Sequence, residues 1–363
     1  MPPVLERREL GRALLARQML LERADATAEE AIARLAGMQA QAPYAPYFGL
    51  WTRLKRFGTD DLADALTGRR LVRVALMRST VHLVTAADYR SLRTWVQPAL
   101  DRELDTAFKK ALAGLDRAAV AEAGRVLLGE RPLTPGELGQ ALSERWPGRE
   151  PRALATVVRN LVPLVQVPPR AVWGVGGAAR YATAATWTGA APAPVPDPER
   201  IVLRYLAAFG PASVKDVQTW AGLTRLHAVM ERLRPRLAVF RDEHGVELFD
   251  LPDAPRPGAD ALAPVRFLPE YDNLLASHAD RTRVISDEAR RRVTTRNGMR
   301  ATFLVDGQVR GAWKLDADRT SATLEIDSFL PLSAAERAEV EAEGARLLEF
   351  AAPGAAHDLR PTT

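Results

Sequence analysis

The sequence contains no cysteine among its 363 residues and no apolar run long enough to cross a bilayer. The missing thiols exclude disulfide scaffolds and thiolate metal sites, and they suit a reducing compartment. The longest apolar stretches, such as "LVRVALM" at 71–77, are far shorter than the roughly 20 residues of a membrane-spanning helix. The first residues, "MPPVLERREL", lack the apolar core of a signal peptide. We therefore expect a cytoplasmic protein with no membrane contact.

Conventional catalytic signatures are also missing. The chain has no HExxH motif, no Walker loop, no GxSxG sequence and no histidine pair at metal-binding spacing. Of its five histidines, only His82 lies within a strand-like motif, "RSTVHLVT", where a structural hydrogen bond is the alternative to a functional role. These absences predict chemistry that uses neither a metal nor another cofactor.

Positive charge is in modest excess, with a net charge of +5 and a pI of about 9.7. A basic surface attracts phosphate backbones, although a GC-rich genome would produce the same arginine-rich composition with no function attached. Lysine is scarce, and no lysine lies in a recognisable site motif: the chain has Lys55, Lys109, Lys110, Lys215 and Lys314.

Two stretches rich in Pro, Gly and Ala predict linkers, at 186–199 ("TWTGAAPAPVPDPE") and at 250–264 ("DLPDAPRPGADALAP"). Proline at this density breaks helices and favours extended spacers. With the repeats described next, these linkers predict four domains, at 1–100, 101–190, 191–257 and 258–363.

The segment between the linkers has the clearest pattern. Three helices are predicted at 197–210, 213–223 and 224–237, the second capped by Ser213, and an alternating hairpin follows with its turn at His244-Gly245. This order is typical of a winged helix. A similar order recurs at 101–190 and at 1–100, and each middle helix opens with Ser or Thr followed by an acidic residue, as in "TAEEAIARLAGM" and "TPGELGQALSER".

The C-terminal segment instead alternates like strands, at 265–277, 300–315 and 321–330, and closes with a helix over 333–350. We expect a small β-barrel or half-barrel here. The predicted fold class is therefore α+β, with three tandem winged-helix units followed by a C-terminal β-barrel-like domain. Trp173, in "PPRAVWG", is expected as a buried aromatic of the second wing.

Tandem winged helices usually bind double-stranded DNA, with a helix in the major groove and arginines on the phosphates. They also serve as protein-interaction modules, so the fold alone does not settle the partner. The candidate DNA-binding residues lie on the first wing, on the third helices and in the arginine-rich stretch "DEARRRVTTRNGMR". They are Arg78, Thr80, His82, Arg152, Arg159, Asn160, Arg225, Arg290, Arg291, Arg292 and Arg296, with Arg232 and Arg300 as further members of the same groups.

Two glutamines, Gln39 and Gln41, flank one alanine in "GMQAQAPYAP". On a helix, residues two apart point about 200° apart, whereas in an extended segment they point to the same side. Pro43 and Pro46 oppose a continuing helix, because residues before proline favour extended geometry. The two amides can therefore face one site, unless they only cap the preceding helix.

Glutamine does not titrate near neutral pH, but its amide can orient a water and place a carbonyl dipole beside a growing positive charge. That chemistry suits a substrate whose leaving group is already activated. An N7-alkylguanine fits this description, since its cationic purine weakens the glycosidic bond and hydrolysis passes through an oxocarbenium-like sugar.

Five segments together resemble the AlkZ-like winged-helix family of bacterial DNA glycosylases: "GMQAQAPYAPYFGLWTRL", "ALMRSTVHLVTAADY", "PPRAVWG", "GPASVKDVQTWAGL" and "FLPEYDNLLASHADRTRVI". The resemblance implies winged-helix units and a C-terminal β-barrel around a DNA channel, and removal of N7-alkylated purines without a metal. The family signature is two glutamines around an aliphatic residue, or a glutamine and an aspartate in a related branch. By this resemblance Gln39 and Gln41 take the catalytic positions. Members of the first branch are associated with self-resistance to DNA-alkylating natural products, and some unhook interstrand crosslinks.

The sequence thus predicts a monofunctional, monomeric DNA glycosylase that acts on double-stranded DNA carrying alkylated purines. Bulky natural-product adducts or crosslinks are the expected lesions, in DNA repair or antibiotic self-resistance. Two alternatives stay open at this point: a tandem winged-helix transcription regulator without catalysis, and an idle DNA-binding or interaction protein of the same fold.

Overall fold

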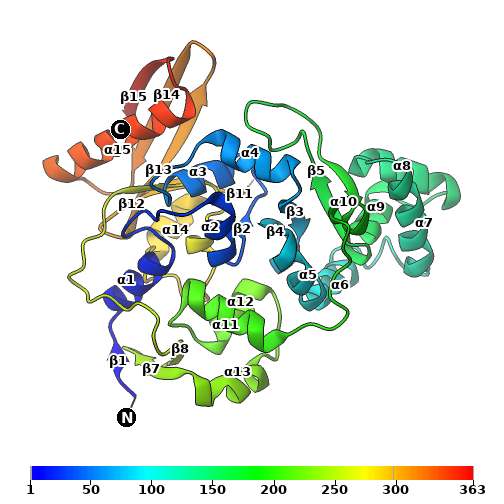
Figure 1. Ribbon diagram of the computed structural model, residues 1–363, viewed down its shortest axis with the longest axis horizontal. Coiled ribbons are helices and arrows are strands. Elements are labelled where there is room, and N and C mark those ends of the chain that lie inside the picture. The colour runs from blue at the N-terminus through cyan, green and yellow to red at the C-terminus, as the bar shows by residue number, and fades with distance from the viewer. Residues whose placement is uncertain (1, 297, 363) are drawn as a thin grey trace.

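The computed structural model describes residues 2–296 and 298–362 and has the predicted mixed α+β composition (Figure 1). The N-terminal block contains short strands and helices that lead into a hairpin. They are β1 (Val4–Leu5), α1 (Arg7–Arg17), α2 (Ala28–Arg34), β2 (Met38–Gln39), α3 (Ala45–Trp51), α4 (Thr59–Thr67), β3 (Leu71–Ala75) and β4 (Val81–Thr85), with a 3-10 turn at Met77–Ser79. Two helices that we did not predict follow, α5 (Ala86–Trp95) and α6 (Gln97–Thr106).

The second and third blocks contain three helices and a hairpin each, in the expected order. The second has α7 (Arg117–Glu130), α8 (Pro135–Arg145), α9 (Pro151–Leu161), β5 (Leu164–Val167) and β6 (Arg180–Thr183), followed by the unpredicted α10 (Ala184–Thr188). The third has α11 (Pro198–Phe209), α12 (Val214–Ala221), α13 (His227–Leu233), a 3-10 turn at Arg234–Arg236, β7 (Ala238–Asp242) and β8 (Glu247–Asp250).

The capped middle helices are confirmed. Helices α2, α8 and α12 each begin with a capping box, in which the first hydroxyl and the acid three residues later satisfy each other's backbone N–H group. The pairs are Thr27 with Glu30, Thr134 with Glu137, and Ser213 with Asp216. These local hydrogen bonds explain why the three helix starts could be read from the sequence.

The first two hairpins do not stand apart as separate wings. They share one five-stranded sheet in the order β2-β4-β3-β5-β6, in which β3 pairs with β5 through Arg73 opposite Gln166 and Val74 opposite Val165. The motif strand β2 lies at one edge of this sheet, paired antiparallel to β4. The arrangement as three winged helices stays a prediction, whereas the shared sheet makes the first two blocks a single layer.

Of the predicted C-terminal barrel or half-barrel, a closed barrel is not formed. The strands form an open sheet in the order β15-β14-β13-β12-β9, and its edge strands β9 and β15 do not pair with each other. The chain leaves β14, crosses one face as α15 and returns as the parallel strand β15, which the sequence analysis missed. Because α15 covers this face with Val340, Leu347 and Leu348, the sheet buries its core without closing.

The elements of the C-terminal segment are β9 (Arg266–Leu268), a 3-10 turn at Asn273–Leu275, α14 (Asp287–Val293), β10 (Thr294–Thr295), β11 (Gly298–Met299), β12 (Ala301–Val305), β13 (Gln308–Ala317), β14 (Ser321–Ser328), α15 (Ala334–Ala351) and β15 (Ala356–Thr362).

Contacts between blocks far apart in sequence hold the molecule together. Strand β1 pairs in parallel with β7 of the third block (Figure 1). The Arg17 guanidinium donates to both carboxylate oxygens of Asp250, and both side chains are fully buried. The four predicted domain boundaries stay a prediction, and both of these contacts join residues of the first predicted domain to residues of the third. Within the described residues, no helix has the length and apolar character needed to traverse a membrane.

Candidate active site

The two glutamines lie on an extended segment, as the surrounding prolines predict. Gln39 ends β2 opposite His82 of β4, and the Ala40 N–H donates to the Val81 carbonyl at 2.8 Å. Ala40 is completely buried, so the two flanking side chains point the other way. Pro46, however, does not oppose a helix, because it occupies the first turn of α3, where its missing N–H costs nothing.

The two amides contact each other directly. Gln39 Nε2 donates to Gln41 Oε1 at 2.8 Å. Arg78 Nη2 donates to Gln39 Oε1, also at 2.8 Å. A guanidinium can only donate, so the atom of Gln39 that faces Arg78 must be its oxygen. Arg78 therefore sets the orientation of both amides, and Gln41 is left with a free –NH₂ group and a second lone pair on Oε1.

The backbone of the motif is held by the C-terminal segment. The Gln39 N–H donates to Asn273 Oδ1 at 3.2 Å, and Asn273 Nδ2 donates to the Gly37 carbonyl at 2.5 Å. Asn273 follows Asp272, whose carboxylate receives two hydrogen bonds at 2.8 Å from Arg53, with both side chains fully buried. Residues more than 200 positions apart thus position the glutamines, and no sequence spacing could have indicated this.

Arg78, which we predicted to contact DNA, is engaged in hydrogen bonds within the protein. It lies at the turn between β3 and β4, in the left-handed region with φ 55°, and also donates to the Trp220 carbonyl of α12. Burial lowers the pKa of Arg78 to about 10, so the guanidinium stays charged at neutral pH. The tip of the first hairpin thus packs against the third block, and in this structure the Arg78 guanidinium is hydrogen-bonded to Gln39.

Two other residues that we predicted to contact DNA have inaccessible side chains in this structure. His82 is 1% exposed, and its Nδ1 lies 3.0 Å from the Thr80 carbonyl. Burial, together with the charge of Arg78, lowers the pKa of His82 to about 3, which makes the ring neutral and structural. Asn160 is completely buried and donates to the Leu100 carbonyl and to Glu103.

A cleft of about 1040 Å³ is lined by residues from both of the first two blocks. Its lining includes Gln41 and the predicted residues Arg152 and Arg159, so the structure does gather these three at one surface. It also includes residues that no motif indicated, namely Ser79, Glu103, Phe108, Lys110 and Arg149. Lys110 is among them although it lies in no recognisable sequence motif.

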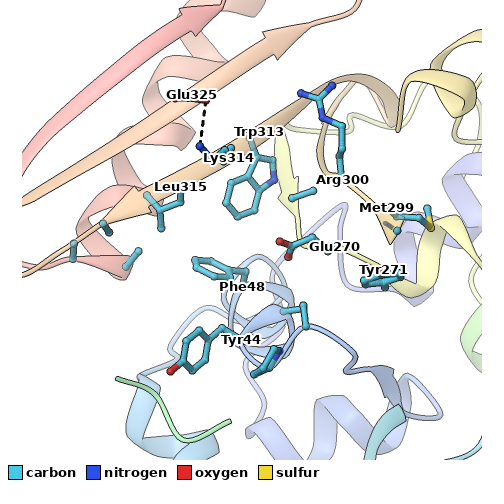
Figure 2. A pocket seen from close by; sticks show the side chains of 18 of the residues that line it. Tyr44, Phe48, Glu270, Tyr271, Met299, Arg300, Trp313, Lys314, Leu315 and Glu325 are labelled. Atoms are coloured by element: carbon cyan, nitrogen blue, oxygen red, sulfur yellow. Dashed lines mark ion pairs between the residues drawn. The ribbon is translucent and has the colours of Figure 1, made fainter. Parts of the chain in front are cut away.

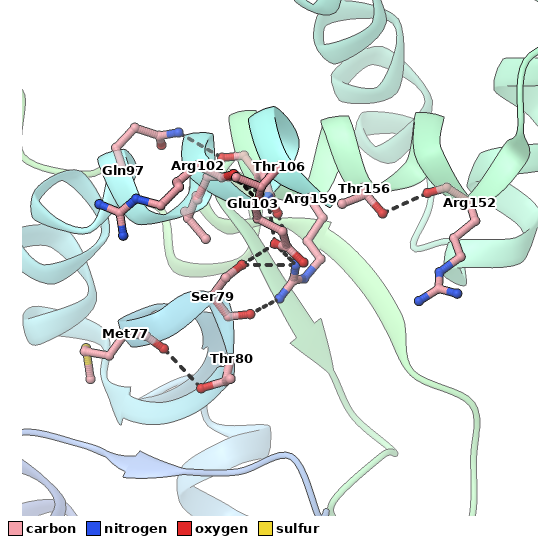
Figure 3. A network of polar contacts seen from close by, with 12 residues as sticks. Met77, Ser79, Thr80, Gln97, Arg102, Glu103, Thr106, Arg152, Thr156 and Arg159 are labelled. Carbon is pink, nitrogen blue, oxygen red and sulfur yellow. Dashed lines mark hydrogen bonds and ion pairs between the residues drawn. The ribbon is translucent and has the colours of Figure 1, made fainter. Parts of the chain in front are cut away.

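A polar network fixes one wall of this cleft. The Ser79 hydroxyl donates to Glu103, and Arg159 Nη1 reaches the same carboxylate at 3.1 Å (Figure 3). Burial opposes ionisation of Glu103, but the hydrogen bonds from Ser79 and Asn160 and the charge of Arg159 outweigh it and lower its pKa below the ordinary value. Glu103 is therefore ionised at neutral pH and cannot act as a proton donor. Thr80 is half-buried and donates to the Met77 carbonyl.

The remaining predicted DNA contacts are exposed but lie outside this cleft. Arg225 follows α12, and the C-terminal group lies on α14 and at the β10–β11 turn: Arg290, Arg291, Arg292 and Arg296. Arg290 pairs with Asp287, while Arg292 pairs with Asp327 and stacks on Phe329 with its guanidinium 4.3 Å from the ring centre. These arginines lie on the surface, so their contact with DNA stays a prediction.

Comparisons with known proteins find one family and a similar fold. A sequence model of the family described as DNA glycosylase AlkZ-like matches residues 32–350. No curated protein matches the sequence significantly. Among solved structures, the chain is similar to the DNA glycosylase AlkZ of Streptomyces sahachiroi, with a TM-score of 0.82 and 20% identity over 99% of this chain and 100% of that one.

Proposed function

Because this chain belongs to the AlkZ-like DNA glycosylase family and is therefore a DNA glycosylase, we propose that its substrates are N7-alkylguanines in double-stranded DNA, above all bulky adducts. The observation that carries the proposal is the Gln39–Gln41 amide pair at the cleft, which offers no titrating base. A neutral amide pair is sufficient only when the leaving base is already cationic. A regulator without catalysis, the alternative left open by the sequence, does not fit the family.

We propose that Gln41 acts on the attacking water. Its Oε1 has one lone pair occupied by Gln39 and a second one free, which can accept a hydrogen bond from water and direct that water to C1′ of the sugar. The same carbonyl dipole stabilises the positive charge that develops on the sugar as the glycosidic bond breaks. Gln39 holds Gln41 in place and adds its own dipole.

We propose that water, and not a lysine amine, attacks the sugar. Lys110 lines the cleft but is exposed to solvent. An exposed ammonium binds phosphate more readily than it forms a Schiff base. Its expected role is therefore to attract the DNA backbone.

The direct test uses duplexes with a single defined lesion. We expect release of 7-methylguanine and formation of an intact abasic site, with no borohydride-trapped covalent complex. A duplex with an uncharged lesion, such as 1,N6-ethenoadenine, is the control and should be processed far more slowly. Equal release of charged and uncharged bases would contradict the proposed specificity, and a trapped complex lost in Lys110→Ala would contradict attack by water.

The first prediction concerns Arg78. Arg78→Ala should slow base release about tenfold, since the Gln39 amide loses the donor that orients it and a net hydrogen bond to a charged group is worth about 1.5–3 kcal/mol. Single-turnover rates and DNA affinity are measured separately. Arg78→Lys keeps a donor and should recover part of the rate. Weakened DNA binding with an unchanged rate would show that Arg78 is a DNA contact after all.

The second prediction concerns the exposed arginines of α14. Affinity for duplex DNA should fall steeply with salt, by about 10³-fold or more between 50 and 200 mM if six or more phosphates are contacted. Replacing Arg290, Arg291 and Arg292 by Glu should weaken binding to all sequences alike and flatten this dependence. The matched control replaces Arg131, Arg319 and Arg337, which are also exposed. If both triple variants lost the same DNA affinity, the effect would come from net charge and not from the position of the α14 arginines.

A further inference from the structure

A second large pocket has a volume of about 1060 Å³ and shares no lining residue with the cleft (Figure 2). We call it the aromatic pocket. Its lining comes from the segment 42–45 with the start of α3, the β10–β11 region, the faces of β13 and β14, and the short segments 173–174, 270–271 and 351–352. Its volume is that of a site for a drug-sized molecule, far more than a methyl group or a single purine needs.

The aromatic pocket begins where the glutamine motif ends. Ala42, Pro43 and Tyr44 line it, and they directly follow Gln41 in the chain. Consecutive Cα atoms are about 3.8 Å apart, so the pocket opens within one to three residues of the proposed catalytic amide. This adjacency in the chain places one wall of the pocket next to Gln41.

The walls of the pocket are aromatic. Tyr44 and Phe48 contact Trp173, with ring centres 5.3 and 5.6 Å apart, and Phe48 contacts Trp313 at 5.4 Å. Trp173 is half-buried and faces this pocket, which corrects our prediction of a buried wing residue. Such rings favour planar partners and attract cations over their faces.

One carboxylate in the pocket lacks a partner. Arg300 pairs with Asp327 at 2.7 Å, Lys314 pairs with Glu325 at 4.0 Å, and Asp318 accepts hydrogen bonds from its own turn. Glu270 is half-buried, has no hydrogen bond or ion pair within the described residues, and points into the space between Phe48 and Trp313 (Figure 2). An unpaired negative charge beside aromatic faces selects for a positively charged ligand.

We propose that the aromatic pocket binds the substituent carried by N7 of the damaged guanine, and that it selects planar aromatic groups with a positive charge. The proposal rests on the proposed N7-alkylguanine specificity and adds to it the chemical class of the adduct. Glu270 supplies the charge, while Tyr44 and Trp173 supply the stacking surface. The size of the pocket favours the substituent over the purine itself.

Binding to the protein alone tests the pocket without relying on catalysis. The full-length chain, free of nucleic acid, is titrated with proflavine, which is cationic at neutral pH, and with acridine, which is neutral. We expect proflavine to bind about tenfold more tightly than acridine, Glu270→Gln to abolish this preference, and Trp173→Leu to weaken both ligands. Glu341→Gln removes the same charge from an exposed site on α15 and should change nothing. Equal affinity of both dyes for the wild-type chain, or an unchanged preference in Glu270→Gln, would overturn the proposal.

Base release then distinguishes the substituent from the purine as the occupant. The three substrates carry 7-methylguanine, an N7 adduct with a neutral planar ring, and the same adduct with a protonated amine. Glu270→Gln should raise the half-saturating enzyme concentration about tenfold for the amine-bearing adduct only. An equal loss on 7-methylguanine would show that the purine enters the pocket instead. If the wild-type enzyme released none of these bases, the proposed function would fail, while the dye titration would still show whether the pocket selects cationic aromatic ligands.

Discussion

Gln41→Ala is expected to slow base release about a hundredfold while leaving DNA affinity nearly unchanged. Loss of one preorganised polar group typically costs on the order of 10²–10³ in rate, and a leaving group that is already cationic needs less help, so the lower end applies. Gln41 is exposed at the cleft, and among the described residues its side chain hydrogen-bonds only to Gln39, so the variant should keep its melting temperature. Single-turnover release of 7-methylguanine measures the effect, and Gln140→Ala, on the exposed face of α8, is the matched control.

Gln39→Ala should have a comparable effect, and the double variant should lose less than the product of the two. Both amides act on one water and one sugar cation, so their contributions are coupled. The rate should also stay flat from about pH 5.5 to 7, because His82, with a pKa of about 3, and Glu103, with a lowered pKa, do not titrate there. Variants that melt earlier but keep their turnover would show that the glutamines only cap the end of α2.

The second large effect is expected on stability. Asp272→Asn should reduce the free energy of unfolding by about 3–5 kcal/mol, because it leaves the fully buried Arg53 guanidinium without its counter-charge. Urea denaturation measures the change. Asp253→Asn, in the exposed loop after β8, removes the same charge from the surface and should be nearly neutral.

The pair Arg53 and Asp272 can be replaced together. A double variant, Arg53→Met with Asp272→Leu, removes both charges and should be more stable than Asp272→Asn alone, since no buried ion is left unpaired. A double variant less stable than either single one would contradict this account. Asn273, the next residue, accepts a hydrogen bond from the Gln39 N–H. If the double variant is fully folded but still releases the base more slowly than the wild type, the glutamine motif has been displaced.

Local signals determined what could be read from the sequence alone. The starts of α2, α8 and α12 were predictable because each capping box is made within four residues. The third block was recognisable because Gly222 and Gly245 adopt the left-handed backbone that ends a helix and turns a hairpin. The extended glutamine segment followed from its neighbouring prolines in the same local way.

The tertiary structure alone decided which side chains share a site. Arg78, His82 and Asn160 have the residue types of DNA contacts, but packing of the first hairpin against α6, α9 and α12 turns them inward. The C-terminal strands have the alternation of a barrel, but the length of α15 and its apolar face allow the sheet to stay open. Burial and long-range pairing depend on which residues lie opposite a side chain in space, and the periodicity of apolar residues in the sequence does not indicate these neighbours. The sequence by itself therefore determined the capped helices, the turns of the third block and the pair of amides on an extended segment, whereas the orientation of those amides by Arg78 came from contacts between residues far apart in the chain.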